Sequence, residues 1–124
     1  MMIEFNNKII KLKAVPNAKV RPQIKDMLLS DEEIVASFES VRDRVIFTNY
    51  RIIAIDTQGL SGVKVDYSMI PYKNIQAYSI ETAGAMDRDC ELEIYLNGVG
   101  KLRFEFHSGV DIVKLSQVMS YYIL

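Results

Sequence analysis

The sequence contains one cysteine, one histidine and no tryptophan. The single Cys90 excludes an internal disulfide and any cysteine-based zinc site. The single His107 has no second histidine for metal binding and no companion for a nucleophilic triad. The acidic stretch from Asp87 to Glu93 does not have the residue spacing of an EF-hand calcium loop. We therefore expect no catalytic residue, no metal and no cofactor, and hence no enzymatic activity.

A charge bias and long apolar runs are absent as well. Fifteen Lys and Arg residues against sixteen Asp and Glu residues give a net charge of −1. No bulk charge attracts the chain to nucleic acid or to an anionic membrane. No apolar run approaches the roughly 18 residues of a membrane-spanning helix, and the start has no basic signal region. We expect a soluble, cytoplasmic, single-domain protein with no nucleic-acid partner and no stable membrane binding.

What the sequence does contain is a succession of short segments typical of β-strands. Val, Ile, Tyr and Phe recur in them, and turn residues such as Gly, Asn and Asp separate them. This pattern favours a mainly β barrel or sandwich. The seven expected strands cover residues 33–41, 45–48, 50–56, 63–70, 75–82, 90–97 and 101–107.

The C-terminal segment carries a clear helix pattern. From Asp111 to Leu124 there is no Gly or Pro. Ile112, Leu115, Met119 and Tyr122 recur at the spacing of one helix face. Burying these four side chains contributes about 1.5–3 kcal/mol each before the entropic cost of folding. The pattern predicts a closing helix that packs against the sheet.

The N-terminal 31 residues are harder to interpret. Pro22 favours a short helix over about residues 22–29, with Ile24, Met27 and Leu28 on its buried side. Residues 1–15 could form an extra strand or an arm that lies on a neighbouring subunit. We therefore divide the chain into an N-terminal arm with a short helix (residues 1–31) and a β-domain with its closing helix (residues 32–124).

The last two expected strands allow a prediction of their register. Their apolar residues are all even-numbered, so antiparallel partners must sum to an even number if both sets face the core. A three-residue loop at 98–100 meets this condition, with Gly100 in the left-handed conformation. Glu93 and Glu105 then face each other, and their like charges indicate a positive charge nearby. The expected pairs are Asn97 with Lys101, Tyr95 with Arg103, Glu93 with Glu105, and Glu91 with His107.

Several segments together resemble a known family. These are RDRVIFTNYRIIAID at 42–56, QGLSG at 58–62, YSMIPY at 67–72 and YSIETAG at 78–84. Each motif is weak alone, but their combination over residues 32–124 is similar to the bacterial pleckstrin-homology-like (PH-like) domain family, as a single-domain member. The resemblance implies a barrel of seven antiparallel strands in two nearly orthogonal sheets, capped by a C-terminal helix.

The resemblance also implies a function without catalysis. Members of the family are expected to form cyclic homo-oligomers, with five subunits for a single-domain member, and to bind protein partners through a polar groove. Polar residues at the matching motif positions are the expected interaction surface. Alternatively, Asp43 and Asn49 make turns, and Arg51 pairs with Glu81 across the sheet. The six expected surface residues are Arg42, Asp43, Asn49, Arg51, Glu81 and Thr82.

A second apolar strip on the closing helix supports assembly. Val110, Val113, Tyr121 and Leu124 lie roughly opposite the core stripe and would be exposed in a single chain. We expect them to form the contact between subunits. The alternative is that they are the stray apolar residues that helix ends often carry.

An anionic-lipid or phosphoinositide module is the alternative function. Arg42, Arg44 and Arg51 surround the first hairpin, but Glu39 and Asp43 offset much of their charge. At about 1 kcal/mol per basic residue near an anionic surface, the net attraction is about 1–2 kcal/mol. That is too little for stable membrane binding without a specific pocket.

Overall fold

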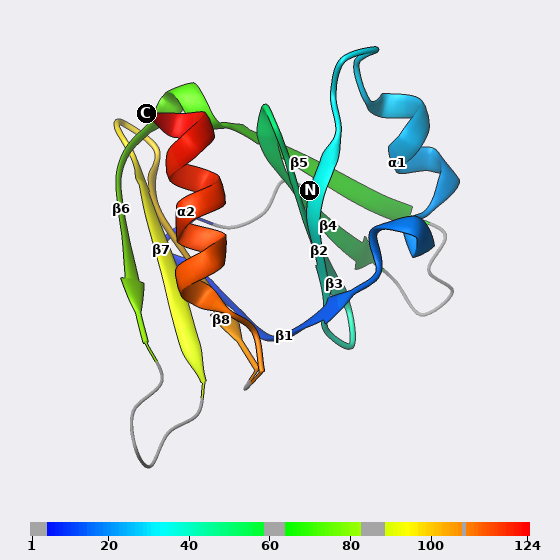
Figure 1. Cartoon of the computed structure of the whole chain (residues 1–124). Helices are drawn as coiled ribbons and strands as arrows, with labels where there is room; N and C mark the ends of the chain where they lie inside the picture. The colour runs from blue at the N-terminus through cyan, green and yellow to red at the C-terminus, as the bar shows by residue number, and fades with distance from the viewer. Residues whose placement is uncertain (1–4, 59–63, 83–88, 108) are drawn as a thin grey trace.

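In the computed structural model the described residues form eight strands, two α-helices and two short 3-10 helices (Figure 1). The structure describes residues 5–58, 64–82, 89–107 and 109–124. The expected turns at 59–62 and 83–85, and most of the acidic loop at 87–89, lie outside these residues. The strands are β1 (Asn7–Val15), β2 (Ile34–Glu39), β3 (Asp43–Thr48), β4 (Arg51–Gln58), β5 (Lys64–Pro71), β6 (Ile75–Glu81), β7 (Cys90–Leu96) and β8 (Gly100–Phe106). The helices are η1 (Asn17–Lys19), α1 (Pro22–Met27), η2 (Tyr72–Asn74) and α2 (Ile112–Ile123).

All eight strands belong to one sheet, in the order β5-β4-β3-β2-β1-β8-β7-β6. The fold is mainly β with a C-terminal helix, as expected, but the expectation of seven strands in two sheets is wrong. β1 joins the two halves, because it pairs antiparallel with β2 and parallel with β8. In the described residues β5 and β6 are the unpaired edges, so the sheet is bent but is not a closed barrel.

For residues 1–15 the sequence predicts either an arm or a strand, because the apolar pattern of β1 is interrupted. Ile9 and Leu12 are buried, whereas Ile10 between them is 45% exposed. The register with β8 shifts between Ile9 and Leu12, and Lys11 has a φ of 59°. A bulge of this kind breaks the period-two alternation by which a strand is recognised in a sequence.

The main core lies inside the bent sheet, with α2 against β6 and β7 (Figure 1). Phe38, Phe47, Phe104 and Phe106 form edge-on ring contacts at its centre. The predicted helix at 111–124 is confirmed. Its N-terminus is capped because the Asp111 carboxylate accepts a hydrogen bond from the Lys114 N–H at 3.0 Å. Three of the four predicted stripe residues, Ile112, Leu115 and Met119, are buried.

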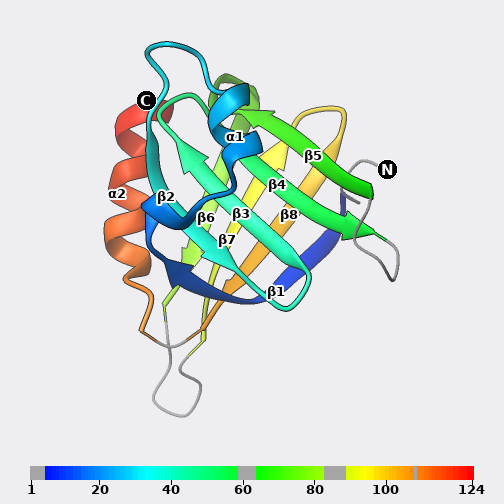
Figure 2. The same cartoon turned by 90° about the vertical axis from the view of Figure 1, so that its right-hand side faces the viewer.

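A second, smaller core lies on the outer face of β2–β5, beneath α1 (Figure 2). Ile24 of α1 is fully buried against Ile46, Ile53 and Ile55. The predicted short helix is confirmed over Pro22–Met27, but Met27 is 38% exposed and was wrongly placed in its buried stripe. A register shift in β2 sends Ile34 to this outer core, whereas Ala36 and Phe38 face the main one.

The β7–β8 hairpin has the predicted parity but not the predicted pairs. Leu96 lies opposite Gly100, so the three-residue loop is 97–99, and Gly98 has the left-handed φ of 78°. The even-numbered apolar residues of both strands are buried, as predicted. Gly100 also has a positive φ, 131°, in the region that favours glycine, and a Cβ there would lie 2.8 Å from the side chain of Asn6, the residue before β1. The observed outward pairs are Tyr95 with Lys101, Glu93 with Arg103, and Glu91 with Glu105.

Ion pairs on the outer face are consistent with this shifted register. The Arg103 Nε atom lies 2.5 Å from Glu93, so the expected contact of Arg103 with Tyr95 is wrong. Lys8 of β1 lies 2.8 Å from Glu91 and 2.7 Å from Glu105. The predicted positive charge between two facing glutamates is therefore present, although one of the glutamates is Glu91 and not Glu93.

Candidate functional site

The outward side of α2 carries exposed apolar side chains that no other described residue covers. Val113, Tyr121 and Leu124 are 51%, 82% and 92% exposed. Their spacing places them on the side of the helix away from Ile112, Leu115 and Met119. Val110, the fourth residue of the predicted strip, is half-buried against the main core. Three apolar residues therefore remain as an exposed surface, which we call the α2 strip (Val113, Tyr121 and Leu124).

At the C-terminal end of α2 the strip meets a group of tyrosines. The Tyr121 ring packs edge-on against Tyr122 at 5.1 Å between centroids, and Tyr122 stacks on Tyr72 at 6.4 Å. Tyr122 is 38% exposed, so it bridges the core and the surface and is not the fully buried residue expected. Tyr50, Tyr72 and Tyr122 line a depression of about 340 Å³ together with Leu29, Asn49, Arg51, Pro71 and Lys73.

Hydrogen bonds to Thr48 at the end of β3 and to Asp31 before β2 hold two of these tyrosines. The Tyr72 hydroxyl donates to the Thr48 carbonyl at 2.6 Å, and burial raises the pKa of Tyr72 above its ordinary value. The Tyr50 hydroxyl donates to the Asp31 carboxylate, and this bond raises the pKa of Tyr50. Sequence reasoning did not identify this group, because its members come from three distant segments. The only local signal was the placement of Tyr50 and Tyr72 beside turns.

Arg51 forms a buried ion pair with Glu32, and not the pair with Glu81 that was the alternative to a surface role. Its Nε and Nη2 atoms lie 2.8 and 2.7 Å from the two Glu32 oxygens. Thr48 donates a further hydrogen bond to Glu32 at 2.7 Å. Burial alone would raise the pKa of Glu32, but hydrogen bonds from Arg51, Thr48 and the Leu29 N–H outweigh it and hold that pKa below its ordinary value. Arg51 therefore has a structural role, because it holds the buried Glu32 carboxylate.

Asn49 also has a structural role. Its side-chain oxygen accepts the Glu33 N–H at 2.8 Å, and its side-chain nitrogen donates to the Asp31 carbonyl at 3.0 Å. These bonds fasten the segment before β2 to the β3–β4 turn. The described non-glycine residues with positive φ are Asn6 and Lys11, so the β3–β4 turn does not use a positive φ at Asn49.

The remaining expected surface residues lie elsewhere. Arg42 is exposed in the β2–β3 turn, and the half-buried Asp43 lies opposite Asp56, where burial and the Asp56 charge raise its pKa. Glu81 and Thr82 are exposed at the end of β6. Asp43 begins β3 and Asn49 follows its end, a separation of about 20 Å at 3.3 Å per residue. One chain therefore does not bring all six residues into a single patch.

No group for catalysis or metal binding gathers in the described part of the chain. Cys90 faces inward as expected, and burial raises the pKa of its thiol, which disfavours the reactive thiolate form. His107 follows β8 and donates its backbone N–H to the Leu12 carbonyl; its expected place opposite Glu91 is wrong. Among the described residues, no three His, Cys, Asp or Glu side chains could hold a metal ion together. None of the described helices is long and apolar enough to cross a membrane.

Comparison with known proteins gives consistent results. The family model of the bacterial PH domain matches residues 4–123. The chain is 43% identical over 81 residues to the uncharacterized protein YjqA of Bacillus subtilis (strain 168), a match that covers 65% of each chain and thus just under two thirds of the relative.

Two of the solved structures that are similar to this fold are bacterial proteins with a pleckstrin-homology domain. One is a DUF1696 family protein with a pleckstrin-homology domain from Shewanella loihica PV-4, with a TM-score of 0.81 and 31% identity, covering 93% of this chain and 99% of that one. The other is a pleckstrin homology domain from Shewanella amazonensis SB2B, with a TM-score of 0.63 and 38% identity, covering 82% and 83%. Both agree with a mainly β fold closed by a helix.

Proposed function

This chain belongs to the bacterial PH domain family, and from that premise we propose that it is a non-enzymatic scaffold that assembles into a closed ring of identical subunits. The observation that carries the proposal is the α2 strip of Val113, Tyr121 and Leu124, together with the adjoining tyrosines. Exposed apolar surface of this kind is costly in water and is typical of a protein–protein contact. A ring of five subunits, as the family resemblance implies, would cover it on every subunit.

The polar residues have a consistent place in this proposal. A ring uses two different surfaces of each subunit, so opposite ends of neighbouring chains can meet. Arg42, Glu81 and Thr82 are exposed and free to contribute to a groove at such a junction, whereas Asp43, Asn49 and Arg51 shape the turns beside it. A repeated groove would allow several weak contacts to one partner to gain about 10²–10⁴ in avidity.

The lipid-binding alternative has less support. Of its three cations, Arg51 is engaged by Glu32, and Arg44 lies 3.9 Å from Glu39. Arg42 is exposed with no ion pair to another described residue. One free arginine contributes about 1 kcal/mol at an anionic surface, which is insufficient for stable attachment.

Light scattering on a size-exclusion column tests the ring. We expect one species near five times the chain mass of 14.2 kDa at micromolar concentration. The variant V113S/Y121S/L124S should elute as a folded monomer. The variant V41S/Y95S/V99S removes apolar side chains that are also exposed but lie away from α2, and it should keep the assembly. A wild-type monomer at all concentrations, or a strip variant that still assembles, would refute the proposal.

A further inference from the structure

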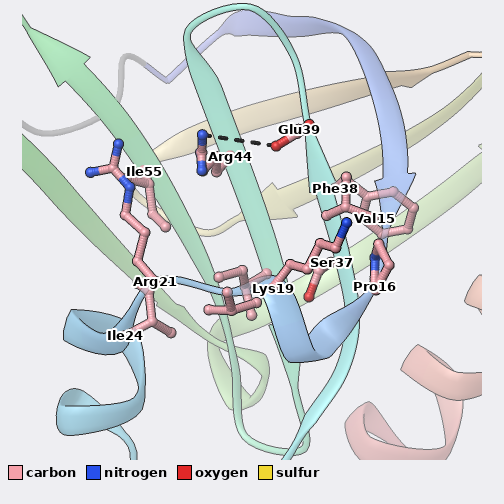
Figure 3. Close-up of a pocket in the computed structure, with 12 residues that line it drawn as sticks. Val15, Pro16, Lys19, Arg21, Ile24, Ser37, Phe38, Glu39, Arg44 and Ile55 are labelled. Carbon is pink, nitrogen blue, oxygen red and sulfur yellow. Dashed lines mark ion pairs between the residues drawn. The ribbon is translucent and has the colours of Figure 1, made fainter. Parts of the chain in front are cut away.

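A second hollow, separate from the α2 strip, lies between the N-terminal segment and the outer face of the sheet (Figure 3). The end of β1, η1 and the start of α1 form one wall, and β2, β3 and β4 form the other. Its volume is about 170 Å³. Apolar side chains line its inner part, among them Val20, Ile24, Ile46 and Ile55.

The walls of this pocket are held in place. The Asn17 side chain accepts a hydrogen bond from the Ser37 hydroxyl at 2.8 Å and donates to the Ile34 carbonyl at 3.4 Å, which ties η1 to β2. At the other end of α1, the Arg51 guanidinium donates to the Met27 carbonyl at 3.0 Å. Ile24 between them is fully buried. The pocket is therefore formed before any ligand arrives, which reduces the entropic cost of binding.

The outer part of the pocket is positively charged. Lys19, Arg21 and Arg44 line it, and Figure 3 shows them around the hollow with Glu39 beside Arg44. Glu39 is the one carboxylate among the lining residues, and it lies 3.9 Å from Arg44, at the outer limit of an ion pair. Neither Lys19 nor Arg21 has an ion-pair partner in the part of the chain that the structure describes. Three cations against one anion favour a negatively charged ligand.

The dimensions of the apolar part restrict the ligand further. A cavity of about 150 Å³ accommodates one benzene molecule. A pocket of about 170 Å³ therefore accepts one leucine- or phenylalanine-sized side chain, and a lipid acyl chain is too long for it. Specific interfaces commonly place such an apolar anchor at the centre and complementary charges around it.

We propose that this pocket binds a short acidic segment of a partner protein, with one leucine- or phenylalanine-sized side chain among Ile24, Ile46 and Ile55 and the flanking carboxylates on Arg21 and Arg44. Lys19 adds a third positive charge at the rim. The site lies outside the surfaces assigned to assembly, so the inference stands whether or not the chain forms a ring.

A displayed library of random short peptides, selected on the full chain, tests this inference. We expect enriched sequences to place Leu or Phe next to Asp or Glu. A synthetic peptide from the enriched set should bind R21Q/R44Q roughly tenfold more weakly, equivalent to about 1.4 kcal/mol. The matched variant K73Q/K101Q loses the same charge at exposed sites outside the pocket and should bind as the wild type does. E39Q should bind the peptide more tightly, because it removes the one carboxylate among the lining residues, which lies 3.9 Å from Arg44.

The same measurements on V113S/Y121S/L124S separate this inference from the ring proposal, since peptide binding should persist in the monomer. Enriched peptides without acidic residues, equal binding to R21Q/R44Q, or a selection that enriches no sequence would overturn it. So would binding confined to vesicles of anionic phosphatidylglycerol, which would make the charged rim a membrane contact.

Discussion

Arg51 and Glu32, nineteen residues apart in the chain, form a bidentate ion pair in which the Glu32 side chain is fully buried. Thr48 and the Leu29 N–H complete the hydrogen bonds of the carboxylate. Arg51 also donates to the Met27 carbonyl at the end of α1. This cluster therefore connects the β3–β4 turn and the segment before β2 to α1. The start of α1 forms part of one wall of the pocket that Lys19, Arg21 and Arg44 line.

Removing the arginine should be strongly destabilising. In Arg51→Met the Glu32 carboxylate stays buried without its partner, and breaking a buried ion pair in this way costs about 3 kcal/mol or more. Arg42→Met is the matched control, since Arg42 is exposed, and we expect a change of about 0.5 kcal/mol or less. Urea unfolding of both variants measures the difference. Equal stabilities would show that the pair contributes nothing to the fold.

The same carboxylate should make stability depend on acid pH. The pKa of Glu32 in the folded chain lies below its ordinary value of 4.5, so Glu32 stabilises the fold above that pH. This contribution declines as the pH falls below about 4.5 toward the folded pKa, because the unfolded chain takes up the proton first. Glu32→Gln should be less stable than the wild type at neutral pH, and the gap should narrow at lower pH. Unfolding curves at several pH values test this; a gap that widens on acidification would contradict it.

The Tyr72 hydroxyl should contribute measurable stability. Tyr72 is 3% exposed, and its bond to the Thr48 carbonyl is made away from water. Tyr72→Phe leaves that carbonyl without this donor, at a cost of about 1–2 kcal/mol. Tyr122→Phe, at the neighbouring stacked ring, removes a hydroxyl from a residue that is 38% exposed and should change little. Thermal unfolding of the two variants should therefore separate them by several degrees, with Tyr72→Phe the lower.

Lys8 should act by relieving repulsion between Glu91 and Glu105, which face each other on β7 and β8. In Lys8→Gln the two like charges are left opposite one another, so the variant should be less stable at low salt. At about 1 M salt the Debye length is only about 3 Å, and the deficit should shrink. The double variant K8Q/E105Q should recover part of the loss. A deficit that does not change with salt would point to lost packing of the lysine stem.

The local sequence pattern was sufficient to predict each segment whose buried side chains recur at a regular interval. The closing helix was predicted because Ile112, Leu115 and Met119 recur at one face, and all three are buried. The parity of the last hairpin was predicted for the same reason. Its exact pairs were not, because a shift of two residues keeps every side chain on its face. In the observed register, Lys8 of β1 contacts both Glu91 and Glu105. No pattern within β7 or β8 reveals these contacts.

The candidate sites were less accessible to such reasoning. Arg51 and Asn49 resemble surface residues in the sequence, but partners far along the chain engage both of them. Lys19 and Arg21 gave no signal beyond two basic residues near a proline, because the pocket exists only where their segment lies against β2–β4. Separation along the chain hides such contacts from any local pattern.

The amino-acid sequence by itself determined the β-rich class, the closing helix, the apolar strip on its outer side and the family, since these follow from side-chain type and short-range spacing. Only the tertiary structure decided that β1 joins all strands into one sheet, that Arg51 pairs with Glu32, and that three cations surround one apolar pocket. Those features depend on which distant segments come into contact. That choice is made by burial of the whole chain and not by any single stretch of it.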